Sequence, residues 1–160
     1  ESGKLTLKTS QMDVVKELSE VLEVFVSRSE REGISLQTFI PKNSVIIYGD
    51  KNRLKQSFVN IIDNSFKYNK KGGTVKVSLN VDNKNVKIVI SDDGCGISKN
   101  DLPRVREKFY KANNTVRGTG IGLAVADEII TKHSGEINIK SVPSQGTEVE
   151  IVLPVDIKEE

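Results

Sequence analysis

Two runs of strictly alternating apolar and polar residues place the tightest constraint on the fold. The first run has its apolar positions at Val75, Val77, Leu79 and Val81, and the second at Val86, Ile88 and Ile90. Alternation with a period of two is typical of a β-strand with one buried face. The polar residues 82–85 separate the two runs, so the sequence predicts an antiparallel hairpin.

Three other stretches have the spacing of amphipathic helices. The first begins after Asp13, a residue type favoured as an N-cap, and ends at Gly33. The second begins near Asp50, and the third follows the segment GTGIGL, runs to His133 and is closed by Gly135. Their apolar or small positions are Val14, Val15, Leu18, Val21, Leu22, Phe25 and Val26; Leu54, Phe58, Ile61 and Ser65; and Leu123, Ala126 and Ile130.

Shorter apolar segments predict further strands near residues 34–40, 45–48, 136–141 and 147–153. Helices and strands are therefore mixed along the chain. Residues 98–117 have no strong periodicity, and a loop of that length in a compact domain is usually functional or mobile.

Composition limits the classes of protein to consider. The chain has 160 residues, 36% hydrophobic and 29% charged, so we expect one globular domain. The net charge is only +2, with 24 basic residues spread among 22 acidic ones, so we expect no nucleic-acid partner. No stretch has the length of a membrane span and the first residues lack a signal-peptide pattern, so we expect a soluble domain.

The second predicted helix carries a polar face. Asn60, Asn64, Lys67 and Tyr68 share one side of it, turned away from the apolar stripe. This could be an ordinary solvated face. Two amides and an ammonium can also hold Mg²⁺ and the phosphates around it, because Mg²⁺ prefers oxygen ligands and a carboxamide adds no negative charge.

Asp92 continues the inward register of the second hairpin strand. An inward carboxylate needs hydrogen-bond donors. The exocyclic amino group of adenine could supply them, and Gly94 and Gly96 would let a ligand approach the backbone. Alternatively, Asp92 caps the following loop through local amides. Thr147 also places a hydroxyl in the inward register of its strand, where a strand threonine with an ordinary partner is the simpler reading.

The segment GTGIGL, residues 118–123, opens the third helix. Free N–H groups and the positive end of the helix dipole could receive phosphate oxygens there. The spacing is not that of a Rossmann dinucleotide fingerprint, and no strand immediately precedes it. No Gly-Lys-Ser/Thr follows, which excludes a P-loop.

Four segments together resemble a known family. The segments NIIDNSFKYN (60–69), DDGCGI (92–97), REKFYK (106–111) and GTGIGL (118–123) are similar, in order and spacing, to the N, G1, F and G2 boxes of sensor histidine kinase ATP-binding domains. These domains belong to the GHKL, or Bergerat-fold, ATPases. The resemblance implies an α/β (α+β) sandwich in which a mixed, mostly antiparallel sheet packs against three helices.

The resemblance also implies roles for single residues. Asp92 would bond adenine and Asn64 would ligate Mg²⁺. Asn60 and Lys67 would reach the phosphates of ATP and carry the catalytic role, and Tyr68 would pack near the adenine and ribose. Residues 98–117 would form a lid over ATP. The other positions assigned to nucleotide binding are Gly94, Gly96, Ile97, Lys111, Arg117, Gly118, Thr119, Gly120, Ile121, Gly122, Leu123 and Thr147.

The resemblance also implies what the rest of the parent protein contains. Residues 1–5 resemble the junction with a dimerising helical hairpin that carries the phosphoacceptor histidine. We therefore expect residues 1–160 to be one catalytic domain that does not autophosphorylate alone. Its partners would be that hairpin and the receiver domain of a response regulator. The parent would be a homodimer, anchored to a membrane in some cases, with this domain in the cytoplasm. His133 lacks the flanking residues of an acceptor and is predicted to be structural.

Asn60 separates this interpretation from related ATPases. Gyrase-type and Hsp90-type members carry a glutamate at this position, which activates the attacking water, whereas an amide cannot take up a proton. Asn60 therefore favours holding ATP intact for phosphoryl transfer. A serine kinase of the anti-sigma-factor type and a nucleotide-binding module without transfer activity are the alternatives.

Two residues depart from simple expectation. Arg106 stands where the F box usually has its first aromatic residue, so it either changes how the lid packs or contacts phosphate or a partner. Cys95 is the only cysteine, which excludes an internal disulfide. Between two glycines it is either a small filler or a redox-sensitive thiol.

Overall fold

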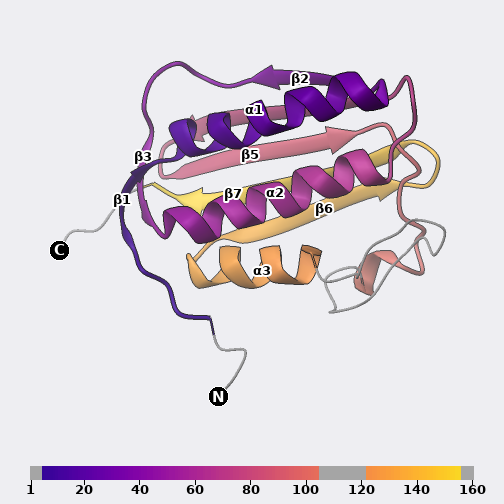
Figure 1. Cartoon of the computed structure of the whole chain (residues 1–160). Coiled ribbons are helices and arrows are strands. Elements are labelled where there is room, and N and C mark those ends of the chain that lie inside the picture. The colour runs from indigo at the N-terminus through magenta and orange to yellow at the C-terminus, as the bar shows by residue number, and fades with distance from the viewer. Residues whose placement is uncertain (1–4, 105–121, 156–160) are drawn as a thin grey trace.

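The computed structural model describes residues 5–104 and 122–155 (Figure 1). In chain order its elements are β1 (Ser10–Asp13), α1 (Val14–Glu32), β2 (Ser35–Phe39), β3 (Ile46–Gly49), α2 (Lys51–Lys67), β4 (Thr74–Asp82), β5 (Asn85–Asp92), a 3-10 helix at Leu102–Arg104, α3 (Gly122–Lys132), β6 (Glu136–Val142) and β7 (Gly146–Pro154).

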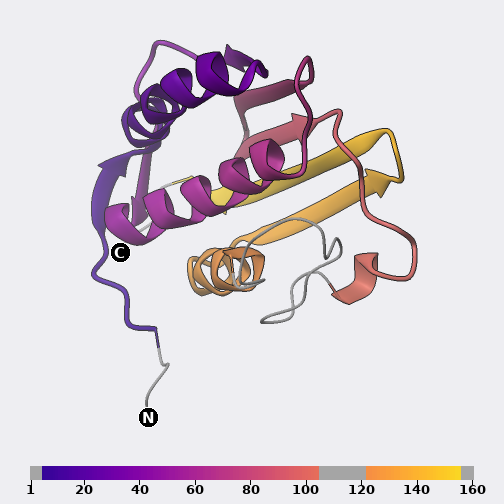
Figure 2. The same cartoon turned by 45° about the vertical axis from the view of Figure 1, so that its right-hand side comes forward.

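The strands form two sheets. The larger has five strands in the order β2-β4-β5-β7-β6, and β1 and β3 form a small two-stranded sheet. Only the β2–β4 pair is parallel among the five. The three helices lie side by side across one face of the larger sheet, as Figures 1 and 2 show. The predicted mixed, mostly antiparallel sheet with three helices is confirmed.

The predicted hairpin forms the centre of the sheet. β4 and β5 are antiparallel, with Val77 opposite Ile90 and Leu79 opposite Ile88. β5 pairs on its other side with β7, where Ile151 lies opposite Ile88. The alternating apolar side chains of these strands are buried beneath the helices, as the period-two pattern predicts, except Val81 near the end of β4.

The ends of α1 follow from residues with a clear physical role. Asp13 Oδ1 accepts hydrogen bonds from the N–H groups of Val15 and Lys16. It also accepts one from Val45, 3.1 Å away, which ties the start of α1 to the segment before β3. Gly33 ends the helix with a φ of 69°, a left-handed conformation that glycine adopts without steric cost.

The helix α2 packs between α1 and α3. Asp50 is its N-cap and accepts from the N–H of Arg53. Its buried face is made of Leu54, Ser57, Phe58, Ile61, Ile62, Ser65 and Phe66. The Phe66 ring stacks on that of Phe25 from α1, with 5.5 Å between the ring centroids.

His133 joins three parts of the chain just after α3. Its Nε2 accepts the N–H of Asp50 at 2.9 Å, so Nδ1 carries the proton and donates to the carbonyl of Ile129 at 2.8 Å. Asp50 Oδ2 in turn accepts the N–H of Lys8 at 2.8 Å. His133 is buried and both its ring nitrogens are bonded to backbone, as the predicted structural role requires.

Four details differ from the sequence prediction. Val26 and Val81 were placed among the apolar positions of their elements, but their side chains are exposed at the surface. The strand β1 was not expected, because its four residues have no period of their own and are extended only through pairing with β3. Gly135 was expected to close α3, but Ser134 adopts the left-handed conformation with a φ of 62°. Gly135 is needed for space instead, since a Cβ there would lie 2.3 Å from the carbonyl oxygen of Val152.

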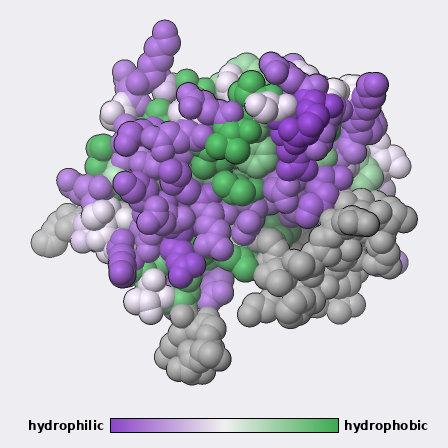
Figure 3. Space-filling view, in the orientation of Figure 1, coloured by the Kyte–Doolittle hydropathy of each residue, from purple (hydrophilic) through white to green (hydrophobic). Residues whose placement is uncertain are grey.

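The helix-covered face is mostly hydrophilic at its surface (Figure 3). Within the two described ranges, no helix combines the length and the apolar character needed to cross a bilayer.

Candidate functional site

The polar face predicted on α2 is present. Asn60, Asn64, Lys67 and Tyr68 are all partly exposed, while the core stripe of the same helix is buried. The side-chain amide of Asn64 makes no hydrogen bond within the described residues, and Lys67 forms an ion pair with Asp63 at 3.5 Å. The face therefore offers amide and ammonium groups near the C-terminal end of α2.

Asp92 is the last residue of β5 and lies opposite Val75 of β4 and Thr147 of β7. Its side chain follows the inward register, as predicted. Oδ1 accepts the N–H of Gly94 at 2.9 Å, so the local cap considered as an alternative is also present.

The electrostatic state of Asp92 is unusual. Burial raises the pKa of its carboxyl to about 6, even though hydrogen bonds from the backbone of Gly94 and Thr147 act in the opposite direction. The hydrogen bonds of the free domain therefore do not fully compensate for the loss of water. An additional donor would stabilise the ionised form, which makes Asp92 a candidate for contact with a ligand.

Asp93 has the opposite environment. Its Oδ1 accepts the N–H of Thr74 at 2.7 Å, and this bond, with the nearby Lys70, lowers the pKa of its carboxyl. It lies on the exposed side of the chain. Two adjacent aspartates are thus divided between a structural and a candidate binding role.

The loop after β5 is held tightly against the end of α2. The N–H of Cys95 donates to the carbonyl of Tyr68 at 3.1 Å. A Cβ at position 94 would lie 2.3 Å from the same carbonyl oxygen, so this close approach requires glycine. Asp92 and the polar face of α2 are consequently brought together.

The turn between β6 and β7 holds the same loop from its other side. The N–H of Ser144 donates to the carbonyl of Cys95 at 2.7 Å. The N–H of Ile97 donates to the hydroxyl of Ser141 at 2.7 Å, and that hydroxyl lies 2.9 Å from the hydroxyl of Thr147. Thr147 thus has an ordinary strand partner next to Asp92.

Ser141 was not predicted to belong to the site. It continues the inward register of Ile137 and Ile139 along β6, with a hydroxyl where the strand ends. The same signal was read for Thr147 on β7 and could have identified Ser141.

Part of the predicted site lies outside the described residues. This applies to Lys111, Arg117, Gly118, Thr119, Gly120 and Ile121, to Arg106, and to most of the predicted lid. Gly122 and Leu123 begin α3, and Leu123 packs against the core. Of the segment 98–104, the structure contains a turn followed by the 3-10 helix.

The side chains around Asp92 and the polar face of α2 determine which metal ion the site could bind. Within the described residues, no group of three or more His, Cys, Asp or Glu side chains could bind a metal ion. The Asn64 amide fits Mg²⁺, which commonly keeps several waters and takes few protein ligands when phosphates supply the rest.

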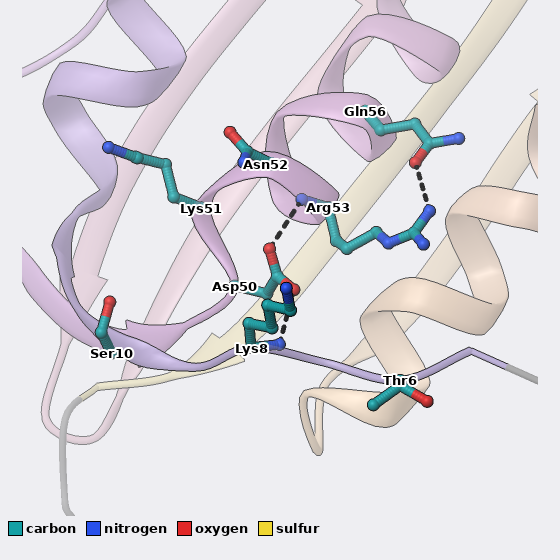
Figure 4. A pocket seen from close by; sticks show the side chains of 8 residues that line it. All are labelled: Thr6, Lys8, Ser10, Asp50, Lys51, Asn52, Arg53 and Gln56. Carbon is teal, nitrogen blue, oxygen red and sulfur yellow. Dashed lines mark hydrogen bonds between the residues drawn. The ribbon is translucent and has the colours of Figure 1, made fainter.

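A separate cavity of about 430 Å³ lies at the N-terminal end of α2, away from Asp92 (Figure 4). It is lined by Thr6, Lys8, Ser10, Asp50, Lys51, Asn52, Arg53 and Gln56. Its cationic groups do not converge, since Arg53 turns to Gln56 at 3.2 Å and Lys51 points away. The cavity is therefore not part of the candidate site.

A mixed sheet under three helices, with an inward aspartate beside two helix-borne amides and a lysine, defines a nucleotide-binding α/β sandwich. The chain belongs to the histidine kinase-, DNA gyrase B-, and HSP90-like ATPases, whose family model matches residues 49–157.

Three comparisons describe its relatives. Sporulation kinase A of Bacillus subtilis (strain 168) is 35% identical over 160 residues, which cover 96% of this chain but only 26% of that protein. A mycobacterial sensor histidine kinase, MprB, has a structure with a TM-score of 0.80 and 28% identity, covering 92% of this chain and 99% of that one. Full-length ShkA in complex with AMPPNP has a TM-score of 0.82 at 22% identity, covering 98% of this chain and 33% of that one.

These findings confirm the resemblance to histidine kinase catalytic domains. The chain is an ATPase domain of the histidine kinase type. It spans about a quarter of the length of the first of these relatives.

Proposed function

We propose that this domain binds Mg²⁺-ATP and donates the γ-phosphoryl group to a histidine on a separate dimerisation domain. The phosphoryl group then passes to the receiver domain of a response regulator. The parent protein acts as a homodimer with this domain in the cytoplasm. One observation carries the proposal: the partly buried carboxylate of Asp92 is joined, through the loop bonded to Tyr68, to the amide-bearing face of α2.

Adenine recognition rests on Asp92. At neutral pH its carboxylate is mostly ionised, because its pKa is about 6. The exocyclic amino group of adenine donates to this carboxylate and supplies the donor that it needs. The absence of a side chain at Gly94 lets the loop pack against the carbonyl of Tyr68, which keeps Asp92 beside the end of α2. Tyr68 packs beside the adenine and ribose, on the partly exposed end of α2.

Phosphate binding rests on the other end of the same face. Asn60 and Lys67 contact the phosphates, and the Asn64 amide oxygen holds the metal. Mg²⁺ held there would neutralise phosphate charge. The N-terminus of α3, beginning at Gly122, contributes the backbone N–H groups of its first turn. The predicted contacts of Lys111, Arg117 and residues 118–121 complete the phosphate site.

Asn60 suits transfer better than hydrolysis. An amide cannot take a proton from water, so ATP persists until an imidazole nitrogen attacks the γ-phosphorus. The new N–P bond forms as the bond between the γ-phosphorus and the bridging oxygen breaks, and ADP leaves with that oxygen. The domain contributes position and charge neutralisation, and the proton on the attacking imidazole is taken up by a base on the dimerisation domain.

The comparisons support this proposal through the kinds of protein that are similar. Sporulation kinase A and MprB are named as kinases, and ShkA was crystallised with the ATP analogue AMPPNP. The family model that matches this chain is one of ATPases.

The test is transfer from ATP labelled at the γ-phosphate to the dimerisation domain of the parent protein, supplied as a separate chain. We expect label on that domain that is stable in base and lost in acid, as phosphohistidine is. Replacing the acceptor histidine by Gln should abolish it. Acid-stable label would favour a serine kinase, and ATP binding without any label would favour a non-transferring module; either result would contradict the proposal.

A further inference from the structure

Four charged residues alternate in sign from the end of α1 to the end of α2. Arg28 Nε lies 2.9 Å from Glu32, and its NH1 group lies 2.5 Å from Asp63 Oδ1. The other oxygen of Asp63, Oδ2, lies 3.5 Å from the Lys67 ammonium. Asp63 thus gives one oxygen to each of two cations, one on each helix.

Arg28 is the fixed member of this row. Its guanidinium lies over the rings of Phe25 and Phe66, at 5.9 and 5.4 Å from the centroids, and its side chain is only 23% exposed. The ring contacts and two charge-assisted hydrogen bonds hold it in place. Asp63, bonded to it at the shorter distance, is anchored on the side of α2 that faces α1.

Lys67 is held less firmly by Asp63. Its contact is 1.0 Å longer than that of Arg28 (3.5 against 2.5 Å), and no hydrogen bond within the described residues accompanies it. The contact draws the ammonium toward α1. Asn64 follows Asp63 by one residue and therefore points about a quarter of a turn further round the helix, away from α1.

We infer that Asp63 is a positioning residue that holds Lys67 to the α1 side of the phosphate site until a polyphosphate displaces it. The inference rests on the proposed function, because it takes Lys67 as a phosphate contact. When Lys67 moves from Asp63 to a phosphate, the Asp63 carboxylate keeps its ion pair with Arg28 and is not left without a cation. Asp63 therefore sets how strongly the site responds to the length of the phosphate chain.

Asp63→Asn tests this inference, with Glu32→Gln as the matched control. Both variants remove one carboxylate from the Arg28 network, but Glu32 does not contact Lys67 within the described residues. Releasing Lys67 from a partly exposed pair should tighten ATP binding by about two- to fivefold. Binding of AMP should be unchanged, and Glu32→Gln should leave the ATP-to-AMP affinity ratio as in the wild type.

A second pair of variants separates contact from general electrostatics. In a Lys67→Met background, Asp63→Asn should no longer change the ATP-to-AMP ratio. If Asp63→Asn still changes the ATP-to-AMP ratio in that background, the change comes from long-range electrostatics and the inference is wrong. It is also wrong if Glu32→Gln raises the ratio equally, or if Asp63→Asn leaves the ratio unchanged or lowers it.

The wild-type domain provides a measurement that needs no variant. The methylene signal of Lys67 next to its ammonium should shift in an NMR titration with ATP and not with AMP. A signal that ATP leaves unmoved would overturn the inference while ATP binding itself persists. Failure of the ATP site itself would look different, because no variant would then bind ATP, and failure of transfer alone would appear only in the labelling test.

Discussion

Replacing Asp92 by Asn should stabilise the free domain and weaken its binding of ATP at the same time. Burial raises the pKa of Asp92 from 3.8 to about 6, so at neutral pH folding takes an ionised carboxylate partly out of water. A rise in pKa from 3.8 to about 6 corresponds to about 3 kcal/mol, and partial exposure reduces the expected loss of folding stability to about 1 to 3 kcal/mol. An amide avoids this cost and can still accept the hydrogen bond from Gly94.

The pH dependence of this effect has a definite sign. The folded domain holds the Asp92 proton more tightly than the unfolded chain, so stability falls as the pH rises from 3.8 to about 6. Above about pH 6 the ionised Asp92 lowers folding stability by its full amount, and below pH 3.8 it lowers stability by nothing. The gain from Asp92→Asn should therefore be largest near pH 8 and fall to about half near pH 5.

Urea denaturation at both pH values, followed by calorimetry with ATP, measures the two effects. Losing charge-assisted bonds to adenine should weaken ATP binding by about ten- to a hundredfold. Asp93→Asn is the matched control. The hydrogen bond from Thr74 lowers the pKa of Asp93, so its charged form stabilises the fold above its ordinary pKa and this variant should lower stability near pH 8. The reasoning is refuted if Asp92→Asn lowers the urea midpoint near pH 8, or gains as much near pH 5.

Three further predictions concern the same domain. The affinity for ADP should fall as the pH drops through about 6, because the protonated Asp92 carboxyl is a weaker acceptor. Calorimetry should show a shallower fall of ADP affinity with pH in Asp92→Asn. An equal fall in the variant and the wild type would show that Asp92 is not in the site. Asn64→Ala should lower the magnesium dependence of ATP binding more than it lowers magnesium-free ADP binding, and an unchanged metal response would place the ligand elsewhere. His133→Ala leaves the N–H of Asp50 without its partner and should cost about 1 to 3 kcal/mol in urea unfolding while ATP affinity stays near wild type; full stability would show that the bond is dispensable.

Local sequence signals predicted most elements of the fold. Asp13, Asp50 and Gly33 act as the helix boundaries that their chemistry favours, and the alternating runs predicted the central hairpin, although its strands extend to Asp82 and Asn85 within the predicted turn. The strand β1 could not be predicted in this way, because it depends on pairing with a partner more than thirty residues away. The arrangement of all three helices on one face came from the family resemblance rather than from periodicity.

Residues of the candidate site could be predicted where the residue type and its position in a strand or helix already indicate a binding role. Asp92 and the α2 face are examples, since a carboxylate or amide at those positions is visible in the sequence. The pairing of Lys67 with Asp63 was missed, although the two residues are four apart on one helix, a spacing at which opposite charges commonly pair. The contact of Asp63 with Arg28 joins two helices, and no local spacing in the sequence indicates it. Ser141 could have been predicted from the inward register of β6, but its contact with the N–H of Ile97 depends on how the loop folds onto it.

The most direct test of the account compares ATP with inosine triphosphate, which has an oxygen in place of the adenine amino group. The two ligands share the ribose and triphosphate and differ at C6 and at N1, which carries a hydrogen in inosine, so calorimetry in the presence of Mg²⁺ tests recognition of the base edge assigned to Asp92. We predict that the wild-type domain binds ATP about tenfold or more tightly than inosine triphosphate, and that Asp92→Asn removes most of this preference. Equal affinities of the wild-type domain for the two nucleotides would contradict the assignment of Asp92 to adenine.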